Sequence, residues 1–284
     1  MAKSYEATSV FTPSMPAVLT FVERDETNDA LVDAIQTPGL QIFLSGSYGS
    51  GKSTLMLNKL RQLYDYHIAT VCIDELTVES IFTSAFDQLD SFYVSEKSSK
   101  RGSKFFAKAG SDRLVKLTLG LEKGTEESAK LRRSAPQLLS PENMTRLLDT
   151  LGACWLLEDV DRLAPEVLDR IATYLKIFTM TAVDHRRVKI LMTSNKDHLD
   201  RFWDDYPALR HRVGAFNLGR MTDDQLAGII EKGCSLLNVE ISDSERARIV
   251  EGAQGSPRDV HAGCLRLCQE EGIHRTCETR VFLV

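Results

Sequence analysis

The chain has 284 residues, of which 43% are hydrophobic and 26% charged, so it can build a sizeable core without disulfides. Its formal net charge of −5 excludes a generally basic nucleic-acid-binding protein. The cysteines form no CxxC pair, no charged and then apolar leader opens the sequence, and no apolar run approaches the roughly 20 residues that span a bilayer. We therefore expect a soluble protein of the reducing cytoplasm.

A glycine-rich loop follows the first predicted strand, which covers residues 40–44. The stretch SGSYGSGKST (45–54) contains the pattern G-x-x-x-x-G-K-[ST], and an amphipathic helix comes after it. Glycines let backbone N–H groups approach phosphate oxygens, and the helix adds its positive N-terminal end. We expect Lys52 to reach the β- and γ-phosphates and Ser53 to ligate Mg²⁺, whereas an ordinary glycine-rich turn is the structural alternative. The predicted nucleotide-binding residues of this loop are Gly46, Ser47, Tyr48, Gly49, Ser50, Gly51, Lys52, Ser53 and Thr54.

A basic insertion, at about residues 95–137, follows the second predicted strand at 68–73. Residues 97–133 carry 11 Lys or Arg and 4 Asp or Glu, a net charge of +7 that leaves −12 for the rest of the chain. Clustered cations beside the aromatic pair Phe105 and Phe106 are typical of an arm that contacts phosphates and stacks on bases. DNA is therefore a candidate partner. A solvated insertion without a binding role and an arm that docks a partner protein are the alternatives.

Acidic residues end the third predicted strand, 153–158. The run ACWLLEDVDRL is continuously apolar up to Glu158, and Asp159 and Asp161 follow. A buried parallel strand that ends in carboxylates at the ligand edge of a sheet is typical of a Mg²⁺-nucleotide site. A buried strand followed by a solvated acidic turn is the structural alternative.

Two more strands, at 188–193 and 214–218, complete an α/β pattern of strands that alternate with helices. The first of the two ends in polar residues that include Asn195, and the segment PALRHRVG before the second contains Arg210 and Arg212. Residues 221–272 then show helical periodicity, with capping boxes that begin at Thr222 and Ser242. We expect a small helical lid over the nucleotide, in which Arg258 lies in the first turn of the helix that Ser256 and Pro257 begin.

In this order and approximate spacing, the motifs resemble the AAA+ ATPases. The resemblance implies a P-loop NTPase whose parallel five-stranded sheet lies between helices, followed by a C-terminal all-helical lid. The segment FVERDETNDALVDAI (21–35) is similar to the one that borders the adenine in replication-initiator and STAND-type ATPases, so Val22 and Arg24 are candidates for that role. We divide the chain into an N-terminal extension (1–20), the AAA+ nucleotide-binding domain (21–220), the lid (221–272) and a C-terminal tail (273–284).

The same resemblance assigns roles to the residues of the candidate site. The AAA+ strand usually ends Asp-Glu, and because this chain has the reverse order, Glu158 takes the metal-side position with Ser53 and Asp159 activates water. Hydrolysis is then expected to be slow. In the family, Asn195 corresponds to a sensor that orients the attacking water, and Arg258 corresponds to a second sensor. Arg212, with Arg210 as second choice, corresponds to the arginine finger given to a neighbouring subunit. The predicted catalytic residues are Lys52, Glu158, Asp159, Asn195 and Arg212, and ordinary structural roles are the alternative for each sensor and for the finger.

Within AAA+, the run TSNKDHLDRFWDDYPALRHRVG looks most like the initiator branch, which includes origin-recognition ATPases and target-selection ATPases of some transposons. Only twelve residues follow the lid, too few for a winged-helix domain, so we do not expect sequence-specific origin binding. We predict an ATP- and Mg²⁺-dependent switch that forms a homo-oligomeric ring or filament and acts on DNA in replication, transposition or repair. A STAND-like ATPase that controls a separate effector protein, for example in phage defence, is the alternative, and a small-molecule phosphotransferase is a third.

One helix face carries His261, Cys264 and Cys268, which raises the question of a second metal. Tetrahedral zinc needs a fourth ligand and usually short paired spacings. Cysteines in the core of an amphipathic helix are far commoner. We therefore expect no metal other than Mg²⁺.

Overall fold

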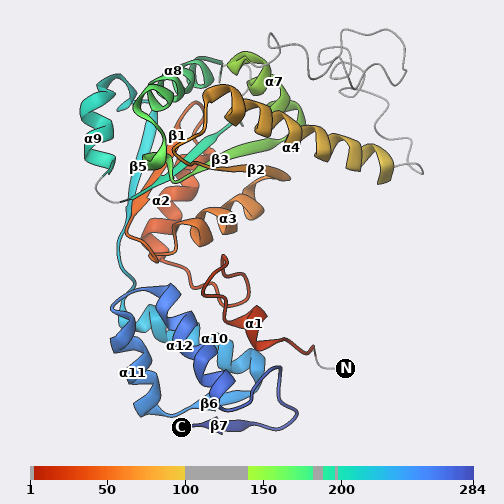
Figure 1. The fold of residues 1–284 in the computed structure, drawn as a ribbon, viewed down its shortest axis with the longest axis vertical. Coiled ribbons are helices and arrows are strands. Elements are labelled where there is room, and N and C mark those ends of the chain that lie inside the picture. The colour runs from red at the N-terminus through yellow and green to blue at the C-terminus, as the bar shows by residue number, and fades with distance from the viewer. Residues whose placement is uncertain (1–2, 100–139, 182–187, 196–197) are drawn as a thin grey trace.

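The computed structural model describes residues 3–99, 140–181, 188–195 and 198–284, and it forms two bodies joined by two crossings of the chain (Figure 1). Most of the predicted basic insertion, with Phe105 and Phe106, lies outside the described residues. No helix within the described residues has the length and apolar character needed to cross a membrane.

The larger body is built on five parallel strands in the order β2-β3-β4-β1-β5. Every strand lies within two residues of its predicted bounds at either end, so the predicted α/β fold with a parallel five-stranded sheet is confirmed. The strands are β1 (Gln41–Gly46), β2 (Tyr66–Val71), β3 (Ala153–Glu158), β4 (Ile190–Ser194) and β5 (Val213–Leu218).

Helices cover both faces of this sheet, as the burial of alternate side chains requires. In β3, Trp155 and Leu157 belong to the core beneath α4, α7 and α8, whereas Cys154 and Leu156 belong to the core beneath α2 and α3. The helices of this body are α2 (Asp25–Gln36), α3 (Lys52–Leu63), α4 (Val78–Ser99), α7 (Pro141–Leu151), α8 (Pro165–Thr181) and α9 (His198–Asp205), with 3₁₀ turns η2 (Val160–Arg162) and η3 (Pro207–Leu209).

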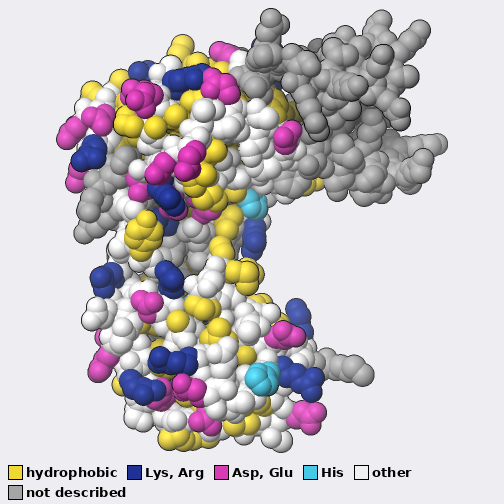
Figure 2. Space-filling view, in the orientation of Figure 1, with side chains coloured by type: hydrophobic (Ala, Val, Ile, Leu, Met, Phe, Trp, Pro, Cys, Tyr) yellow, Lys and Arg dark blue, Asp and Glu magenta, His cyan; other side chains and the backbone are white. Residues whose placement is uncertain are grey.

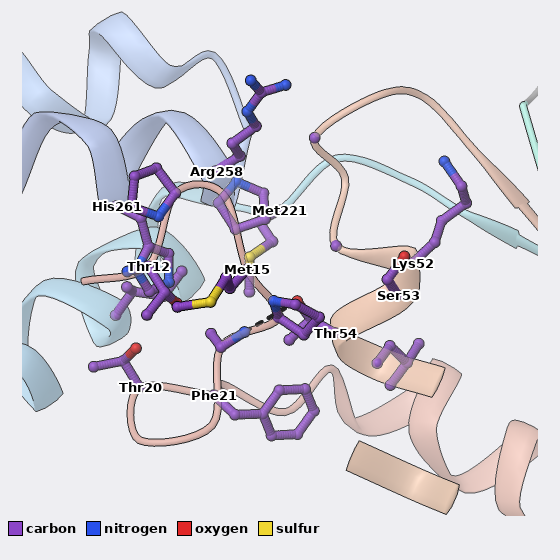
Figure 3. Close-up of a pocket in the computed structure, with 18 of the residues that line it drawn as sticks. Thr12, Met15, Thr20, Phe21, Lys52, Ser53, Thr54, Met221, Arg258 and His261 are labelled. Carbon is purple, nitrogen blue, oxygen red and sulfur yellow. Dashed lines mark hydrogen bonds between the residues drawn. The ribbon is translucent and has the colours of Figure 1, made fainter. Parts of the chain in front are cut away.

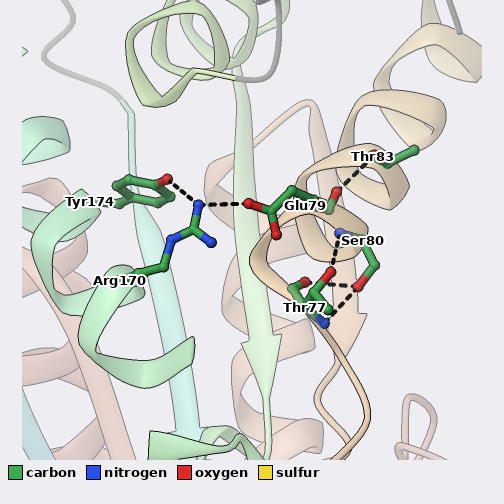
Figure 4. Close-up of polar contacts among 6 residues, drawn as sticks. All are labelled: Thr77, Glu79, Ser80, Thr83, Arg170 and Tyr174. Carbon is green, nitrogen blue, oxygen red and sulfur yellow. Dashed lines mark hydrogen bonds and ion pairs between the residues drawn. The ribbon is translucent and has the colours of Figure 1, made fainter. Parts of the chain in front are cut away.

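Side chains fix the start of α4 and join it to α8 (Figure 4). Thr77 and Ser80 cap the helix reciprocally: the Ser80 N–H donates to Thr77 Oγ1 at 3.1 Å and the Thr77 N–H donates to Ser80 Oγ at 3.0 Å. Arg170 of α8 pairs with Glu79 at 2.7 Å and donates to the Tyr174 hydroxyl at 3.3 Å. Because both side chains of this pair are exposed, it contributes little to stability.

The smaller body is the lid, which contains α10 (Asp223–Leu237), α11 (Asp243–Ala253) and α12 (Pro257–Glu270). The capping box at Thr222 is present, and Ser242 Oγ accepts the N–H of Glu245. The lid is not entirely helical as expected, because β6 (Val239–Ile241) pairs in parallel with β7 (Val281–Leu283). These strands are too short to show a period-two pattern, and their pairing makes residues 273–284 part of the lid.

The N-terminal extension also packs into the lid. The short helix α1 (Ala7–Val10) lies beside the lid in Figure 1, and Phe11 fills the space that a Cβ on Gly233 of α10 would occupy, 2.2 Å from its ring. The Ala7 N–H donates to the His274 carbonyl at 2.9 Å. Residues 5–11 therefore belong structurally to the lid, 200 residues and more before it in sequence.

Candidate nucleotide-binding site

A cavity of about 360 Å³ lies between the α/β domain and the lid. The molecule is hollowed on one side between these two bodies (Figure 2). Four parts of the chain line the cavity: the N-terminal segment, the glycine-rich loop with the start of α3, the end of β3, and the lid from Met221 through helices α10 and α12. Among the predicted site residues, the cavity lining includes Tyr48, Gly49, Gly51, Lys52, Ser53, Thr54, Glu158, Asp159 and Arg258.

The glycines of the loop are required by its geometry. A Cβ on Gly46 would lie 2.8 Å from the Leu218 carbonyl oxygen and 2.9 Å from Ser50 Oγ. Gly49 and Gly51 have φ values of 73° and 91°, in the left-handed region that glycine adopts without strain. The loop therefore curls tightly between β1 and α3, as a phosphate-binding loop does. Gly46, Ser47 and Ser50 shape it from outside the cavity lining.

Lys52 begins α3 and keeps its ammonium group within the loop. The side chain is buried, and Nζ donates to the carbonyl oxygens of Gly46 at 2.8 Å and Ser47 at 3.3 Å. Burial lowers the pKa of Lys52, and the carboxylates of Asp159, Asp161 and Glu158 act against that shift. The ammonium group thus lies between the loop carbonyls and the acids that follow β3.

The acids after β3 differ in environment. Glu158 Oε1 is buried and has no hydrogen-bond partner among the described residues. A carboxylate oxygen left unpaired in this way fits a site that Mg²⁺ completes, and Ser53 supplies a second oxygen to the same cavity. Asp159 has a φ of 56°, and its N–H donates to Thr193 Oγ1 at 3.1 Å, so its backbone is held by the end of β4.

Asn195 is occupied by the same acidic turn. Its Nδ2 donates to Asp161 Oδ2 at 2.7 Å and its N–H donates to Asp161 Oδ1 at 3.2 Å. Asn195 is not part of the cavity lining. The predicted sensor is thus bonded to Asp161 in this structure, and its role towards an attacking water stays a prediction.

The two candidate arginine fingers, Arg210 and Arg212, lie at the amino-terminal end of the strands, opposite the glycine-rich loop. The Arg212 carbonyl accepts the N–H of Gln41, the first residue of β1, whereas the glycine-rich loop follows the last residue of that strand. Six extended residues place these ends roughly 20 Å apart, so Arg212 does not reach the cavity of its own chain. Arg212 Nη1 donates to the Ala208 carbonyl at 2.7 Å, and Arg210 is exposed, 4.0 Å from Asp204.

The lid touches the glycine-rich loop through the first turn of α12. Ser256 caps this helix by accepting the N–H of Asp259 at 3.3 Å, and its Oγ lies 3.5 Å from the Gly49 carbonyl. Arg258, two residues after Ser256 in the first turn of α12, also lines the cavity (Figure 3). The glycine-rich loop and α12 are therefore in contact where they line the cavity.

Arg24 joins three parts of the molecule. It donates to the Gly219 carbonyl at 2.8 Å, where the chain passes into the lid, and also to the Ser50 carbonyl in the loop. Burial lowers the pKa of Arg24 to about 10. Val22 and Arg24, the candidates for the segment that borders the adenine, both line the cavity.

The end of the cavity away from Lys52 was missed by sequence reasoning. Thr12, Met15, Met221 and His261 gather there (Figure 3). No motif marks residues 12–17, and His261 was considered only as a metal ligand with Cys264 and Cys268. Those two cysteines lie in the lid core, whereas His261 Nδ1 accepts the N–H of Thr12 at 3.0 Å. Burial lowers the pKa of His261 to about 4, so the ring is neutral.

A five-stranded sheet, a glycine-rich loop with its lysine, and carboxylates at the end of a neighbouring strand define a P-loop nucleoside triphosphatase. The model of the family Novel STAND NTPase 1 matches residues 5–269, and the chain belongs to that family. The membership confirms the predicted enzyme class, an ATPase of the P-loop type, and the STAND features of the resemblance.

Solved structures support the fold. The chain is similar to a Walker-type ATPase of Pyrococcus abyssi (TM-score 0.61, 14% identity, 88% of this chain and 69% of that one). It is also similar to the ORC2 protein of Aeropyrum pernix (TM-score 0.59, 14% identity, 95% and 68%). A third similar structure is a STAND protein of Pyrococcus horikoshii with a tetratricopeptide repeat sensor (TM-score 0.51, 15% identity, 86% and 30%). A search of curated proteins found no match.

Proposed function

We propose that the chain is a nucleotide-controlled switch that binds ATP with Mg²⁺, hydrolyses it slowly, and passes its nucleotide state through the lid to another macromolecule. One observation carries the proposal: Lys52, Glu158 and Arg258 come from three separate elements and line one cavity. A nucleotide in that cavity contacts the lid and the catalytic edge of the sheet together. Its hydrolysis therefore changes what holds the two bodies in place.

The residues have distinct tasks in this mechanism. Lys52 Nζ exchanges the Gly46 and Ser47 carbonyls for β- and γ-phosphate oxygens. Ser53 and Glu158 hold Mg²⁺, which neutralises charge on the phosphates when bound. Asp159 accepts a proton from the attacking water. Arg258 binds the phosphates from the lid side, so that loss of the γ-phosphate weakens lid closure.

The family favours a protein effector as the partner. STAND stands for signal transduction ATPase with numerous domains, and the similar Pyrococcus horikoshii protein has a tetratricopeptide repeat sensor. Action on DNA stays a prediction, because it depends on the basic insertion outside the described residues. Homo-oligomer formation is likewise part of the proposal.

The primary test is nucleotide binding by the Lys52→Ala variant. We expect it to lose more than about tenfold in ATP affinity by calorimetric titration, because it removes the charge-assisted contact at the phosphates. Arg61→Ala, which changes an exposed cation on the same helix, is the control and keeps the wild-type affinity. Wild-type affinity in Lys52→Ala would refute the proposal.

Sedimentation separates the partners. The protein is run with ADP or a non-hydrolysed ATP analogue, with and without duplex DNA, at two salt concentrations. If the partner is a protein effector, we expect the sedimentation coefficient to depend on the nucleotide and to be the same with and without DNA. Association with DNA that weakens at the higher salt concentration would instead favour the hypothesis that the switch acts on DNA.

A further inference from the structure

We infer that His261 and Thr12 recognise the edge of the nucleobase and select adenine over purines that carry a proton on N1. This inference rests on the proposed function, because it takes the cavity as the nucleotide site. It concerns the end of the cavity opposite Lys52 and Ser53, the residues to which we assign the phosphates and Mg²⁺ (Figure 3).

The hydrogen bonds of His261 determine which ring nitrogen carries its proton. Nδ1 accepts the N–H of Thr12 at 3.0 Å, so the proton of the neutral ring is on Nε2. The ring is held from the other side by an edge contact with Phe11, with centroids 6.1 Å apart. His261 is 4% exposed and lines the cavity, and Nε2 has no partner among the described residues. Nε2 is therefore a fixed hydrogen-bond donor that cannot accept, on a residue that lines the cavity.

Thr12 supplies the complementary group. Its Oγ1 is buried and has no hydrogen-bond partner among the described residues, and Thr12 also lines the cavity. A buried hydroxyl without a partner is costly unless a ligand or water completes it. The same amide-to-imidazole bond that orients His261 joins it to Thr12, so the two residues that carry an unpaired group lie in one part of the cavity lining.

The chemistry of this pair matches adenine. The Nε2–H donates to adenine N1, and the Thr12 hydroxyl accepts from the exocyclic amino group at C6. Hypoxanthine and guanine carry a proton on N1, which would oppose the proton on Nε2. The apolar side chains of Met15 and Met221 lie in the same part of the cavity and suit the faces of a purine ring (Figure 3).

The test compares three nucleotides on the wild-type protein by calorimetric titration: ATP, inosine triphosphate, and 1-deaza-ATP, in which a C–H replaces N1. We expect ATP to bind at least about tenfold more tightly than either analogue, because each lacks the acceptor for Nε2–H. This comparison needs no variant and so does not depend on how a substitution folds.

Variants then assign the preference to residues. His261→Phe keeps a ring against Phe11 and should bind ATP and 1-deaza-ATP alike. Thr12→Val should weaken ATP while leaving the ratio between ATP and 1-deaza-ATP in place. Arg266→Ala, an exposed change on the same helix, is the control and behaves as the wild type.

Equal affinity of the wild type for all three nucleotides, still dependent on Lys52, would overturn this inference and leave the proposed function standing. A His261→Phe variant that folds and still prefers ATP to 1-deaza-ATP would also overturn it. If no nucleotide bound at all, the proposed function would fail as well.

Discussion

A single buried imidazole makes the stability of the lid sensitive to mild acid. The pKa of His261 is lowered from 6.5 to about 4 by burial, so below about pH 6.5 the unfolded chain takes up a proton that the folded chain refuses. The free energy of unfolding should therefore fall as the pH falls from about 6.5 to about 4, by at most about 3 kcal/mol. Thermal unfolding of the nucleotide-free protein at about pH 7.5 and about pH 5 measures this. His261→Phe should lose less stability over the same interval, and an equal loss would contradict the burial argument.

The reversed acids at the end of β3 give a second prediction at this scale. Asp159→Asn should keep ATP binding and lower turnover roughly tenfold or more, because it removes a proton acceptor. Asparagine tolerates the left-handed backbone of this position, φ 56°, so the change leaves the turn intact. Glu158→Gln should instead raise the Mg²⁺ concentration needed for tight ATP binding. If Glu158→Gln abolished turnover with unchanged Mg²⁺ dependence and Asp159→Asn did not, the two roles would be exchanged.

At the scale of elements, the contact between the glycine-rich loop and α12 can be broken by one methyl group. A Cβ on Gly49 would lie 2.8 Å from Ser256 Oγ, at a φ of 73° that alanine adopts only with strain. Gly49→Ala should therefore separate the lid from the loop, lower the melting temperature and weaken ATP binding. Gly252→Ala, in α11 with nothing within 4 Å of the added carbon, is the matched control. It should keep ATP binding and gain up to about 1 kcal/mol of stability.

Elements with a strong local signal were predictable from the sequence. The glycine-rich loop, the apolar strand before Glu158 and the capping box at Thr222 each depend on neighbouring residues, and the structure shows all three. The end of the cavity that Thr12 and His261 line is formed by residues far apart in the sequence. Thr12 meets His261 across 249 residues, and the three-residue strands β6 and β7 pair only because the lid brings them together. Periodicity and spacing carry no information about such contacts.

Asn195 shows a related limit. Its place after β4 predicted a polar group at the ligand edge, and the side chain is at that edge. Its partner, Asp161, depends on how the chain turns into η2 after β3, which the order of the motifs does not specify. The topology therefore predicts where the polar side chain of Asn195 lies, but its hydrogen-bond partner depends on the local turn that contains Asp161.

At the scale of the whole molecule, the position of Arg212 predicts shared active sites. It lies at the amino-terminal end of the strands, away from its own cavity, so an arginine finger at this position can serve only a neighbour's nucleotide. Arg212→Ala should bind ATP normally and hydrolyse it poorly. Mixing it with Lys52→Ala should restore activity, because one interface then combines an intact loop with an intact arginine. Fingers of this kind contribute roughly 10³ to 10⁵ in rate, so partial rescue is measurable.

Arg210→Ala is the companion variant in that experiment, because Arg210 is the more exposed of the two and has only a 4.0 Å pairing with Asp204. If mixing with Lys52→Ala restored the activity of Arg210→Ala but not that of Arg212→Ala, the arginine finger would be Arg210. A protein that stays monomeric with ATP and turns over at a rate per chain independent of concentration would refute the shared site and favour a phosphotransferase.

The joining of the N-terminal segment to the lid determines when the cavity can be completed during folding. Tyr5 and Thr276 are 271 residues apart, so the wall that contains Thr12 forms only after the ends of the domain have both been synthesised. Contacts of such sequence separation close large loops and form late. The α/β domain, whose strands pair over shorter distances, can fold first with its phosphate loop in place. A nascent chain or one cut within residues 5–20 would thus hold the loop and the acids but lack the cavity wall that contains Thr12.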